Sequence, residues 1–540
     1  MHANKAQKAK AQTATSSRRH FLGGLLGAGG LSAAALAGLG AEAPPGASGP
    51  FSVSSFGATG DGKQLETKAL QAAIDACAAA GGGTVHFPAG RHLSGTLFLK
   101  SRVTLHLEAG AVLLGSPRLE DYPSTVPALR SYTDNYTERS LLYAENLDDV
   151  AICGRGVIDG QGAAFKGSYK VRPYLMRWVS CRGVSVRGIT LKDSPMWVQH
   201  YLACAGVLID GIRVTSTCNH NNDGIDIDAC DGVRIANCDI RSGDDSIVLK
   251  STLDQPCKNI VITNCTLSSH CSAFKLGTES NGGFENIALS NCTIYDTRLA
   301  GIALELVDGG TLERVTVSNV VMHNARNAIF IRLGNRARPF KKGMEAPGVG
   351  RLRHVRISDV QVFGADAIGC SITGLPDSPV EDVALDNVSV SFTGGGTMED
   401  AKREPPEHAA DYPEYNMFGP LPAYGFFCRH ARGLRLSRVQ VDVVKPDARP
   451  SLVCEDVIDL DVFGWRALSV NESPALTFRN VREALVHGCK AAAGTSVYLS
   501  LHGEQSRAIG LAANDLSQAA QPVARDREVP ASAVRVEANR

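Results

Sequence analysis

The sequence lacks an excess of either charge: 55 lysines and arginines balance 55 aspartates and glutamates. Proteins that bind nucleic acid present a basic surface, so this balance predicts no nucleic-acid partner. Fifteen cysteines are present, but no two have Cys-x-x-Cys spacing, which argues against a zinc site. The segment Asp226–Cys230 departs from a calcium-binding loop at its third ligand position. We therefore expect no metal and no cofactor.

Long apolar runs are also absent, except near the N-terminus. The pair Arg18–Arg19 precedes a Gly/Ala/Leu-rich run that ends near Leu39, and the small residues of Ala41–Ala43 follow. This pattern resembles a twin-arginine signal, which exports proteins that are already folded. Residues 1–43 are thus the predicted signal and 44–50 a linker, with an uncleaved anchor helix as the alternative. The pattern predicts a periplasmic or secreted protein without stable membrane association after export.

A repeat of about 27 residues dominates the chain from residue 150 onward. Alternating apolar strands begin at Val207, Val233, Ile260 and Ile287, in steps of 26, 27 and 27 residues. One such coil cannot bury its apolar face until another coil stacks on it. The repeat therefore predicts an all-β fold, a single-stranded right-handed parallel β-helix that forms one domain over residues 51–510. We expect this domain to be a monomer.

Asparagine and cysteine recur within this repeat, as Asn-Cys pairs that begin at Asn237, Asn264 and Asn291. We expect the asparagine side chains to bond turn backbones and the cysteines to pack as small apolar groups inside the coils. These residues are therefore given a structural role, and no catalysis is assigned to the cysteines.

The ends and interruptions of the repeat have their own signals. Residues 67–80 have helical periodicity and precede three glycines, which predicts a short helix capping the open end of the stack. Two insertions interrupt the period, a basic one at 324–354 and an aromatic one at 393–430. Such loops either build a binding groove or decorate the surface. Residues 511–540 show no periodicity, and we expect a loosely ordered tail.

Three carboxylates in the stretch Cys218–Lys250 carry the strongest chemical signal. Asp223 precedes a glycine and the alternating strand Ile225–Asp228, and Asp244–Asp245 follow a second glycine about one repeat later. Clustered carboxylates repel one another, so one holds a proton while another stays charged. That division supplies the acid and the base that hydrolysis of a glycosidic bond requires. The alternative is that aspartate and glycine here only form turns.

At these residues the sequence resembles the polygalacturonase family, family 28 of the glycoside hydrolases. The resemblance covers residues 51–500 and rests on five motifs, which are Phe56–Gly62, Val157–Gly162, Ser194–His200, Asn221–Asp223 and Asp244–Asp245. In the fourth motif, asparagine stands where the family has threonine. The resemblance implies the parallel β-helix and a pectic polysaccharide or oligosaccharide substrate of the plant cell wall.

The resemblance also implies roles for the three aspartates. Asp244 is expected to protonate the leaving oxygen, while Asp223 and Asp245 orient and deprotonate the attacking water, with inversion at the anomeric carbon. Carboxylates closer than about 6 Å are usual in retaining enzymes. The family inverts with a tighter cluster, so spacing alone does not decide the outcome.

Two departures from the family pattern bear on the substrate. The family's histidine falls on Ser272, with His270 two residues earlier, so either His270 is re-aimed or Glu279 and its neighbours tune the acid. The family's Arg-Ile-Lys motif, which grips a uronate carboxylate, falls on Ala303–Glu305. A glutamate there repels galacturonate. Either the subsite takes a neutral sugar such as rhamnose, or Arg332 reaches in from the basic insertion.

The remaining candidate substrate-binding residues have ordinary structural alternatives. Trp197 and His200 line a sugar subsite or are a core tryptophan and a bonded histidine, and Lys275 supplies positive charge or is solvated. Two other functions remain open on this fold. One is a pectate-lyase-like enzyme that uses calcium and a basic residue for β-elimination. The other is a non-catalytic β-helical carbohydrate-binding protein.

Overall fold

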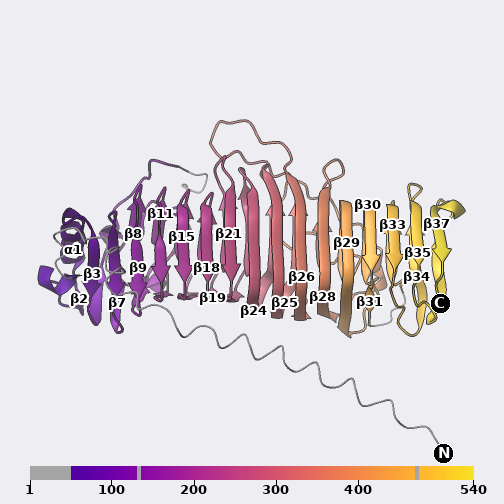
Figure 1. Ribbon diagram of the computed structural model, residues 1–540, viewed down its shortest axis with the longest axis horizontal. Helices are drawn as coiled ribbons and strands as arrows, with labels where there is room; N and C mark the ends of the chain where they lie inside the picture. The colour runs from indigo at the N-terminus through magenta and orange to yellow at the C-terminus, as the bar shows by residue number, and fades with distance from the viewer. Residues whose placement is uncertain (1–49, 131–135, 469–472) are drawn as a thin grey trace, which may run out of the picture. The chain divides into compact units, whose positions relative to one another are not determined.

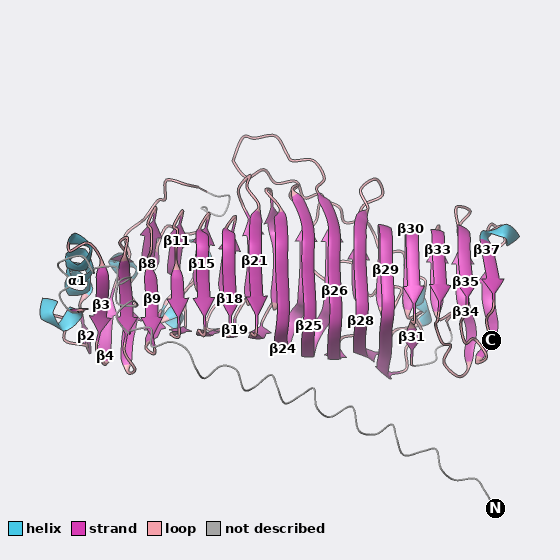
Figure 2. Cartoon of the chain, in the orientation of Figure 1, coloured by secondary structure: helices cyan, strands magenta, loops and turns pink. Residues whose placement is uncertain are grey.

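A computed structural model describes residues 50–130, 136–468 and 473–540. The twin-arginine segment lies outside the described residues. Within residues 49–540 the strands follow one another in chain order, coil upon coil, as the colour gradient of Figure 1 shows. Every pair of named strands is parallel, and the fold is the expected right-handed parallel β-helix. Figure 2 shows that helices are confined to a few short segments.

Three ladders of hydrogen-bonded strands form the faces of the coil. The first ladder contains β1 (Phe51–Ser52), β3 (Gly83–Phe87), β6 (Val103–Leu107), β9 (Ala151–Gly154), β12 (Ser185–Arg187), β15 (Ala205–Asp210), β18 (Asp231–Ala236), β21 (Cys257–Thr263), β33 (Arg482–His487), β35 (Arg507–Ala512) and β37 (Val534–Glu537). The second contains β2 (Asp61–Leu65), β4 (Gly90–Ser94), β7 (Ala111–Gly115), β10 (Val157–Asp159), β13 (Thr190–Lys192), β16 (Arg213–Ser216), β19 (Asp239–Ser242), β22 (Thr266–Ser269) and β31 (Arg466–Ala467). The third contains β5 (Leu97–Phe98), β8 (Ser140–Glu145), β11 (Tyr174–Val179), β14 (Gln199–Leu202), β17 (Ile225–Asp228), β20 (Ile247–Ser251), β23 (Phe274–Ser280), β27 (Cys370–Thr373), β32 (Leu476–Arg479), β34 (Thr495–His502) and β36 (Ala519–Arg525).

Six longer strands bend across more than one ladder. They are β24 (Phe284–Leu306), β25 (Thr311–Leu333), β26 (Arg351–Ala365), β28 (Val380–Gly394), β29 (Phe426–Lys445) and β30 (Leu452–Phe463). Because β24 and β25 pair along almost their whole length, the C-terminal parts of both strands continue the third ladder beside β23.

The helices lie at the ends of the coils and in the loops. The capping helix expected at residues 67–80 is α1 (Thr67–Ala79), and its buried side chains pack at the first coils. The second helix is α2 (Met398–Ala401). The described 3₁₀ turns are η1 (Val53–Phe56), η2 (Leu119–Asp121), η4 (Gly162–Ala164), η5 (Tyr169–Val171) and η6 (Ala531–Ala533). No described helix is long and apolar enough to cross a membrane.

The register of the third ladder separates a core row from an outer row. Ile227, Leu249, Leu276 and Leu304 occupy equivalent positions on successive strands and are fully buried inside the coil. Side chains alternate between the two faces of a strand, so their neighbours in sequence point out of the coil. Polar side chains on β17, β20, β23 and β24 therefore lie side by side on one outer face.

The repeated asparagines bond from coil to coil, and not to the turn backbones as the sequence predicted. Asn237 and Asn264 have left-handed φ values of 59° and 55°, which asparagine tolerates better than most residues. Their side chains bond the preceding coil instead of the turn backbone: Asn237 donates to Asp210 (2.8 Å) and Asn264 donates to Asn237 (3.4 Å). The cysteines that follow them, Cys238 and Cys265, are buried as expected.

The C-terminal residues differ from the loosely ordered tail expected for 511–540. Strand β36 pairs with β34, and β37 pairs with β35, so the coil continues to Glu537. Val529 and Ala533 join the apolar core. Alanine and glutamine conceal this coil in the sequence because they weaken the apolar alternation that marks earlier coils.

Removal of residues 519–540 therefore exposes the edges of β34 and β35 and the apolar core behind them. We expect a lower midpoint of thermal unfolding and aggregation on heating, because unpaired strand edges recruit other chains. Differential scanning calorimetry and light scattering of the truncated and full-length chains measure both effects. Identical midpoints in the two chains contradict the ordered last coil.

Candidate functional site

Three turns, each preceding a strand of the third ladder, stack on one another. Asp223 precedes β17, Asp245 precedes β20, and Ser272 precedes β23. The backbone N–H of Gly224 donates to the Asp245 carbonyl (2.9 Å), and that of Ser246 donates to the Ser272 carbonyl (2.9 Å). The repeat period thus places Asp223, Asp244 and Asp245 on adjacent coils, on the same side of the coil.

The turn that carries Asp223 is held by its neighbours. The buried Asn222 amide donates to the carbonyls of Ser194 and Met196, both at 2.9 Å. A Cβ at Gly224 would lie 2.5 Å from the Ser246 carbonyl oxygen, so only glycine allows the two coils to approach this closely. The asparagine and the glycine of the Asn-Asn-Asp-Gly sequence therefore position the carboxylate between them.

Four aspartates form what we call the acidic cluster: Asp223, Asp226, Asp244 and Asp245. Asp245 accepts the Ser272 N–H (2.9 Å), and its own N–H donates to the Asp244 carboxylate (2.9 Å). Neither carboxylate oxygen of the fully buried Asp226 has a hydrogen-bond partner among the described residues. Asp226 is not one of the three aspartates that the sequence points to, but its charge raises the pKa of Asp223, so it belongs to the same cluster.

Burial and mutual repulsion favour the protonated form within this cluster. Burial raises the pKa of Asp223 well above its usual range, and the charges of Asp226 and Asp244 raise it further. Burial and then the Asp245 charge raise the pKa of Asp244, although the nearby Cys271, Lys275 and Lys250 oppose the rise. The cluster therefore holds at least one proton at a pH where an isolated aspartate holds none.

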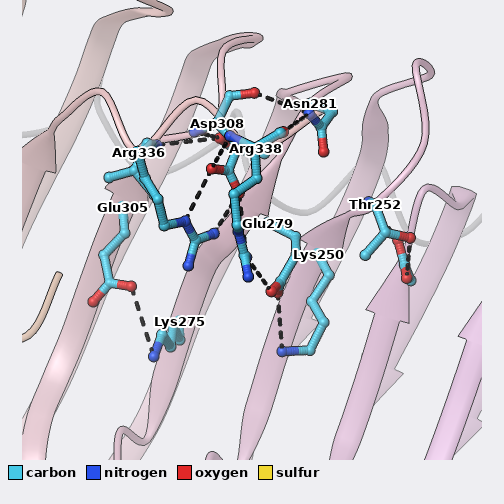
Figure 3. Close-up of polar contacts among 12 residues, drawn as sticks. Lys250, Thr252, Lys275, Glu279, Asn281, Glu305, Asp308, Arg336 and Arg338 are labelled. Carbon is cyan, nitrogen blue, oxygen red and sulfur yellow. Dashed lines mark hydrogen bonds and ion pairs between the residues drawn. The ribbon is translucent and has the colours of Figure 1, made fainter. Parts of the chain in front are cut away.

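Lys275 is the cation nearest to the expected catalytic aspartates. Its Nζ lies 3.5 Å from Asp245 Oδ2, 3.6 Å from Glu305 Oε2 and 3.6 Å from Glu414 Oε1. Figure 3 shows Lys275 and Glu305 facing each other from β23 and β24. Burial disfavours the ammonium, but these carboxylates outweigh burial and raise the pKa of Lys275. Lys275 is therefore a buried, charged member of the site and not a solvated lysine.

Lys250 heads a second ion-pair network that borders the cluster. Its Nζ lies 3.7 Å from Asp226, 3.8 Å from Glu279 and 5.0 Å from the centre of the Trp197 ring. Glu279 also accepts from Arg338 (2.7 Å), which with Arg336 binds Asp308 (Figure 3). Burial opposes the charge of Glu279, but Lys250 and Arg338 prevail and lower its pKa to about 2. Glu279 therefore faces Lys250 and the arginines.

Trp197 and His200 are buried side chains behind this network. Trp197 packs on Tyr136, Tyr174 and the edge of His200. His200 Nε2 lies 3.4 Å from Asp228, which also accepts from Thr252. The Trp197 ring contacts Lys250, and the His200 ring contacts Asp228. These contacts fit the alternative of a core tryptophan and a bonded histidine.

Two expected substrate-binding residues are not part of the acidic cluster. The basic loop spans only residues 334–350, so Arg332 lies on β25, where it is buried and donates to Gly374 O (3.1 Å) and Glu407 O (2.6 Å). His270 is half-buried, and the charges that lower its pKa, after burial, come from Arg298 and Arg241. Arg332 thus bonds main-chain carbonyls away from the acidic cluster, and the charges that act on His270 come from two arginines rather than from the aspartates.

The sequence signals missed two residues of the aromatic insertion. Glu414 reaches Lys275. Tyr412 as a whole residue is 54% exposed, and the centre of its ring lies 5.6 Å from Lys275 and 5.5 Å from Arg336. Glu414 and Tyr412 lie more than 130 positions beyond Lys275 in the chain, and no period connects them to it. Only the folded chain brings them together.

One group in the described residues offers three atoms of the kind that bind metals. A carboxylate oxygen of Asp244, one of Asp245 and the Cys271 sulfur lie within 4.8 Å of one another. Burial and the two aspartates raise the pKa of the Cys271 thiol, which keeps it protonated, whereas metal ligation requires a thiolate. This arrangement suits proton sharing among the aspartates better than metal binding.

These features define a class of protein: a parallel β-helix with clustered carboxylates on the outer face of one ladder, suited to acid and base chemistry. The family model of Glycosyl hydrolases family 28 matches residues 77–410, which is more than half of the chain. The chain belongs to this family, as its motifs indicated.

Individual relatives agree with this assignment. A probable polygalacturonase of Vitis vinifera is 38% identical over 218 residues, 37% of this chain and 44% of the relative. An exo-poly-alpha-D-galacturonosidase of Dickeya chrysanthemi is 40% identical over 120 residues, 21% of this chain and 19% of the relative. The chain thus matches less than half the length of these curated relatives. The crystal structure of a hyperthermoactive exopolygalacturonase from Thermotoga maritima has 25% identity and a TM-score of 0.55, covering 63% of this chain and 86% of that one.

The low pKa of Glu279 implies that the free energy of unfolding depends on pH. A folded-state pKa of about 2, below the usual 4.5, contributes stability that is present above pH 4.5 and is lost as pH falls toward 2. We expect Glu279→Gln to lower the free energy of unfolding by about 2 kcal/mol or more at pH 7, since it removes the buried carboxylate that faces both Lys250 and Arg338. Urea unfolding at a series of pH values measures the difference.

Glu285→Gln is the matched control, because Glu285 pairs with Arg314 (3.1 Å) on the surface. Such exposed pairs contribute about 0–1 kcal/mol. The gap between wild type and Glu279→Gln should narrow as pH falls below about 4.5, the usual pKa of glutamate. A gap that stays constant with pH removes the charge of Glu279 as its cause.

Proposed function

We propose that the protein is a glycoside hydrolase that cleaves a pectic polysaccharide with Asp223, Asp244 and Asp245. One observation carries the proposal: three carboxylates from adjacent coils meet on one face, with raised pKa values for Asp223 and Asp244 beside a charged Lys275. Hydrolysis of a glycosidic bond needs a proton donor and an acceptor within one site. The named activities of the polygalacturonase relatives support the pectic substrate.

Asp244 is the general acid in this proposal. Burial and the Asp245 charge raise its pKa, so it retains the proton that the leaving oxygen needs. Activity requires the protonated acid, and it should therefore fall as pH rises through this raised pKa. The Cys271 thiol next to Asp244 adds no competing charge while it keeps its proton.

Asp245 and Asp223 orient and deprotonate the attacking water. Asp245 receives the Ser272 N–H and the Lys275 ammonium, which suit an anionic carboxylate. Asp223 has one buried oxygen without a hydrogen-bond partner in the described structure, and the attacking water is the partner that we assign to it. A water molecule held by these two carboxylates attacks the sugar on the face opposite Asp244, and this attack inverts the configuration at the anomeric carbon.

The sugar next to the cleaved bond is neutral in this proposal. Glu305 is fully buried 3.6 Å from Lys275 Nζ, and its two oxygens accept no hydrogen bond from the described residues, so it competes with any substrate carboxylate for that ammonium group. Lys275 and Lys250 each face at least two carboxylates already. A uronate carboxylate would have to compete with them, whereas a rhamnose-like sugar brings no charge. Arg332, bonded to Glu407, does not supply the missing cation.

A polymer substrate requires a protein outside the cytoplasm. The twin-arginine segment at Arg18–Arg19 supplies that route, to the periplasm or to the medium, and the polysaccharide is then accessible. The same proposal makes the exported protein a monomer without a metal or other cofactor.

Substitution of Asp244 by asparagine tests the proposed chemistry. Asparagine keeps the size of the side chain but cannot donate a carboxylic proton, so we expect the turnover number to fall about 10²–10⁴-fold with folding intact. New reducing ends released from homogalacturonan and rhamnogalacturonan measure turnover, and proton NMR of the first product identifies its anomer.

Asp254→Asn, on the exposed turn after β20, is the control and should retain wild-type turnover. Turnover within about tenfold of wild type in Asp244→Asn removes Asp244 from the acid role. An unsaturated product that absorbs in the ultraviolet and disappears with a calcium chelator would establish a lyase instead. Binding of pectic fragments without any turnover in wild type would establish a non-catalytic protein.

The charge of Glu305 is tested by Glu305→Gln. Glutamine removes one of the three carboxylates that compete for Lys275, so a uronate carboxylate should be tolerated better and activity on homogalacturonan should rise relative to rhamnogalacturonan. A tenfold change in this ratio corresponds to about 1.4 kcal/mol, a reasonable size for one buried charge. Initial rates on the two polymers measure it.

Glu381→Gln serves as the control, because Glu381 pairs with Arg351 on the surface of the first ladder. It should leave the ratio unchanged. An unchanged ratio in Glu305→Gln as well means that Glu305 does not exclude uronates.

A further inference from the structure

The aromatic insertion, expected at 393–430, spans only residues 395–425 between β28 and β29, and it packs on the third ladder. Tyr415, Phe418 and Leu421 pack on Phe330 of β25 and Phe427 of β29. At its C-terminal end the buried Arg449 binds Asp447 (2.7 Å) and donates to the carbonyls of Leu421 (3.1 Å) and Ala423 (3.4 Å). This half of the insertion therefore has a defined place on the outside of the coil.

Two further buried arginines hold the other half. Arg332 donates to Glu407 O (2.6 Å), and Arg429 donates to Pro405 O (2.6 Å) and Pro406 O (3.2 Å). The segment 408–414 is thus tied down on both sides. Its Tyr412 and Glu414 reach Lys275, although the two belong to a different part of the chain.

Lys275 has more carboxylates than one ammonium group can neutralise. Asp245, Glu305 and Glu414 all lie 3.5–3.6 Å from its Nζ, and none is closer than the others by more than 0.1 Å. The side chain of Glu414 is 25% exposed, whereas that of Glu305 is fully buried. Glu414 is therefore the member of this group that comes from the insertion, and its side chain is more exposed than that of Glu305.

We propose that Glu414 is a positioning residue of the acidic site: it shares Lys275 with Asp245 and thereby sets how much positive charge reaches the aspartates. The inference rests on the proposed hydrolytic function and assigns the insertion a part in it. Glu414 touches neither the sugar nor the water in this role. It acts through Lys275 and through its own negative charge.

The groups that face Glu414 come from three other parts of the chain. They are Lys275 on β23, Asp244 and Asp245 before β20, and Glu305 on β24, while the Tyr412 ring of the same insertion contacts Lys275. Burial, Asp245 and Asp244 raise the pKa of Glu414, and Lys275 lowers it. Interaction between two charges is mutual, so the charge of Glu414 also favours the protonated form of Asp244.

Glu414→Gln removes this charge at nearly constant shape. The general acid should then lose its proton at lower pH, and the alkaline limb of kcat/KM should move to lower pH by about 0.5–1 unit, as expected for one charge several ångströms away. Glu414→Asp keeps the charge and should return the limb toward wild type. Glu404→Gln removes the same charge from an exposed position of the same insertion and should leave the limb in place.

A purely structural role gives a different result. If Glu414 only held the insertion in place, Glu414→Gln would lower the midpoint of thermal unfolding while the limb stayed at the wild-type pH. If the wild type hydrolyses the substrate and the alkaline limb of kcat/KM in Glu414→Gln stays at the wild-type pH, the inference about Glu414 is overturned. The proposed function is then unaffected.

Thermal unfolding across pH gives a readout that needs no turnover. Carboxyl groups with raised folded-state pKa values stabilise the fold below their ordinary pKa, and this stability is lost as pH rises through the raised values. The fall in unfolding midpoint between about pH 4 and pH 7 should be smaller in Glu414→Gln than in wild type and Glu404→Gln. Equal falls in all three chains overturn the inference, even if the wild type hydrolyses nothing and the proposed function fails.

Discussion

The site depends on the register of the third ladder. A shift of one residue between neighbouring strands would turn the buried Ile227 row outward and the polar row inward. Ile227, Leu249 and Leu276 therefore do more than fill the core: by occupying equivalent positions they force Asp226 and Lys275 onto the outer face. The turns before these strands inherit the same register, which stacks Asp223 on Asp245. Carboxylates that repel one another are thus held together by apolar side chains on the other face of the same strands.

Charge balance is the second constraint, because burial penalises every ion in the site. Lys250 and Lys275 remain charged only because each is surrounded by carboxylates, and Glu279 remains charged because Lys250 and Arg338 face it. Asp226 and Glu305 have no hydrogen-bond donor in the described structure, and burial raises the pKa of both. The site therefore contains ions that are well compensated beside carboxyl groups that are not. Carboxyl groups with perturbed pKa values are concentrated at functional sites, and here they surround the three aspartates of the proposed chemistry.

The features that repeat were predictable from the sequence. Apolar positions in steps of about 27 residues gave the β-helix, and the helix at 67–80 was found at Thr67–Ala79. The step also placed Asp223 and Asp244–Asp245 one coil apart. Prediction from the sequence failed where the 27-residue period is broken or weak. The last coil, rich in alanine and glutamine, was predicted to be a loosely ordered tail. Arg332 was predicted to lie in a loop because the sequence locates the boundary of the insertion only to within several residues.

Contacts between distant parts of the chain could not be predicted in any case. Nothing in the sequence relates Glu414 to Lys275, since the link depends on how Arg332, Arg429 and Arg449 fasten the insertion to the coil. Arg332 shows the point well: it was expected to bind substrate, yet its guanidinium binds the main chain of the insertion that carries Glu414. The coils of a repetitive scaffold place acidic side chains at a fixed spacing, but each coil presents an outer face similar to that of its neighbours. An insertion tied down by buried arginines brings a side chain to that face from outside the repeat, and this allows one coil to differ from its neighbours.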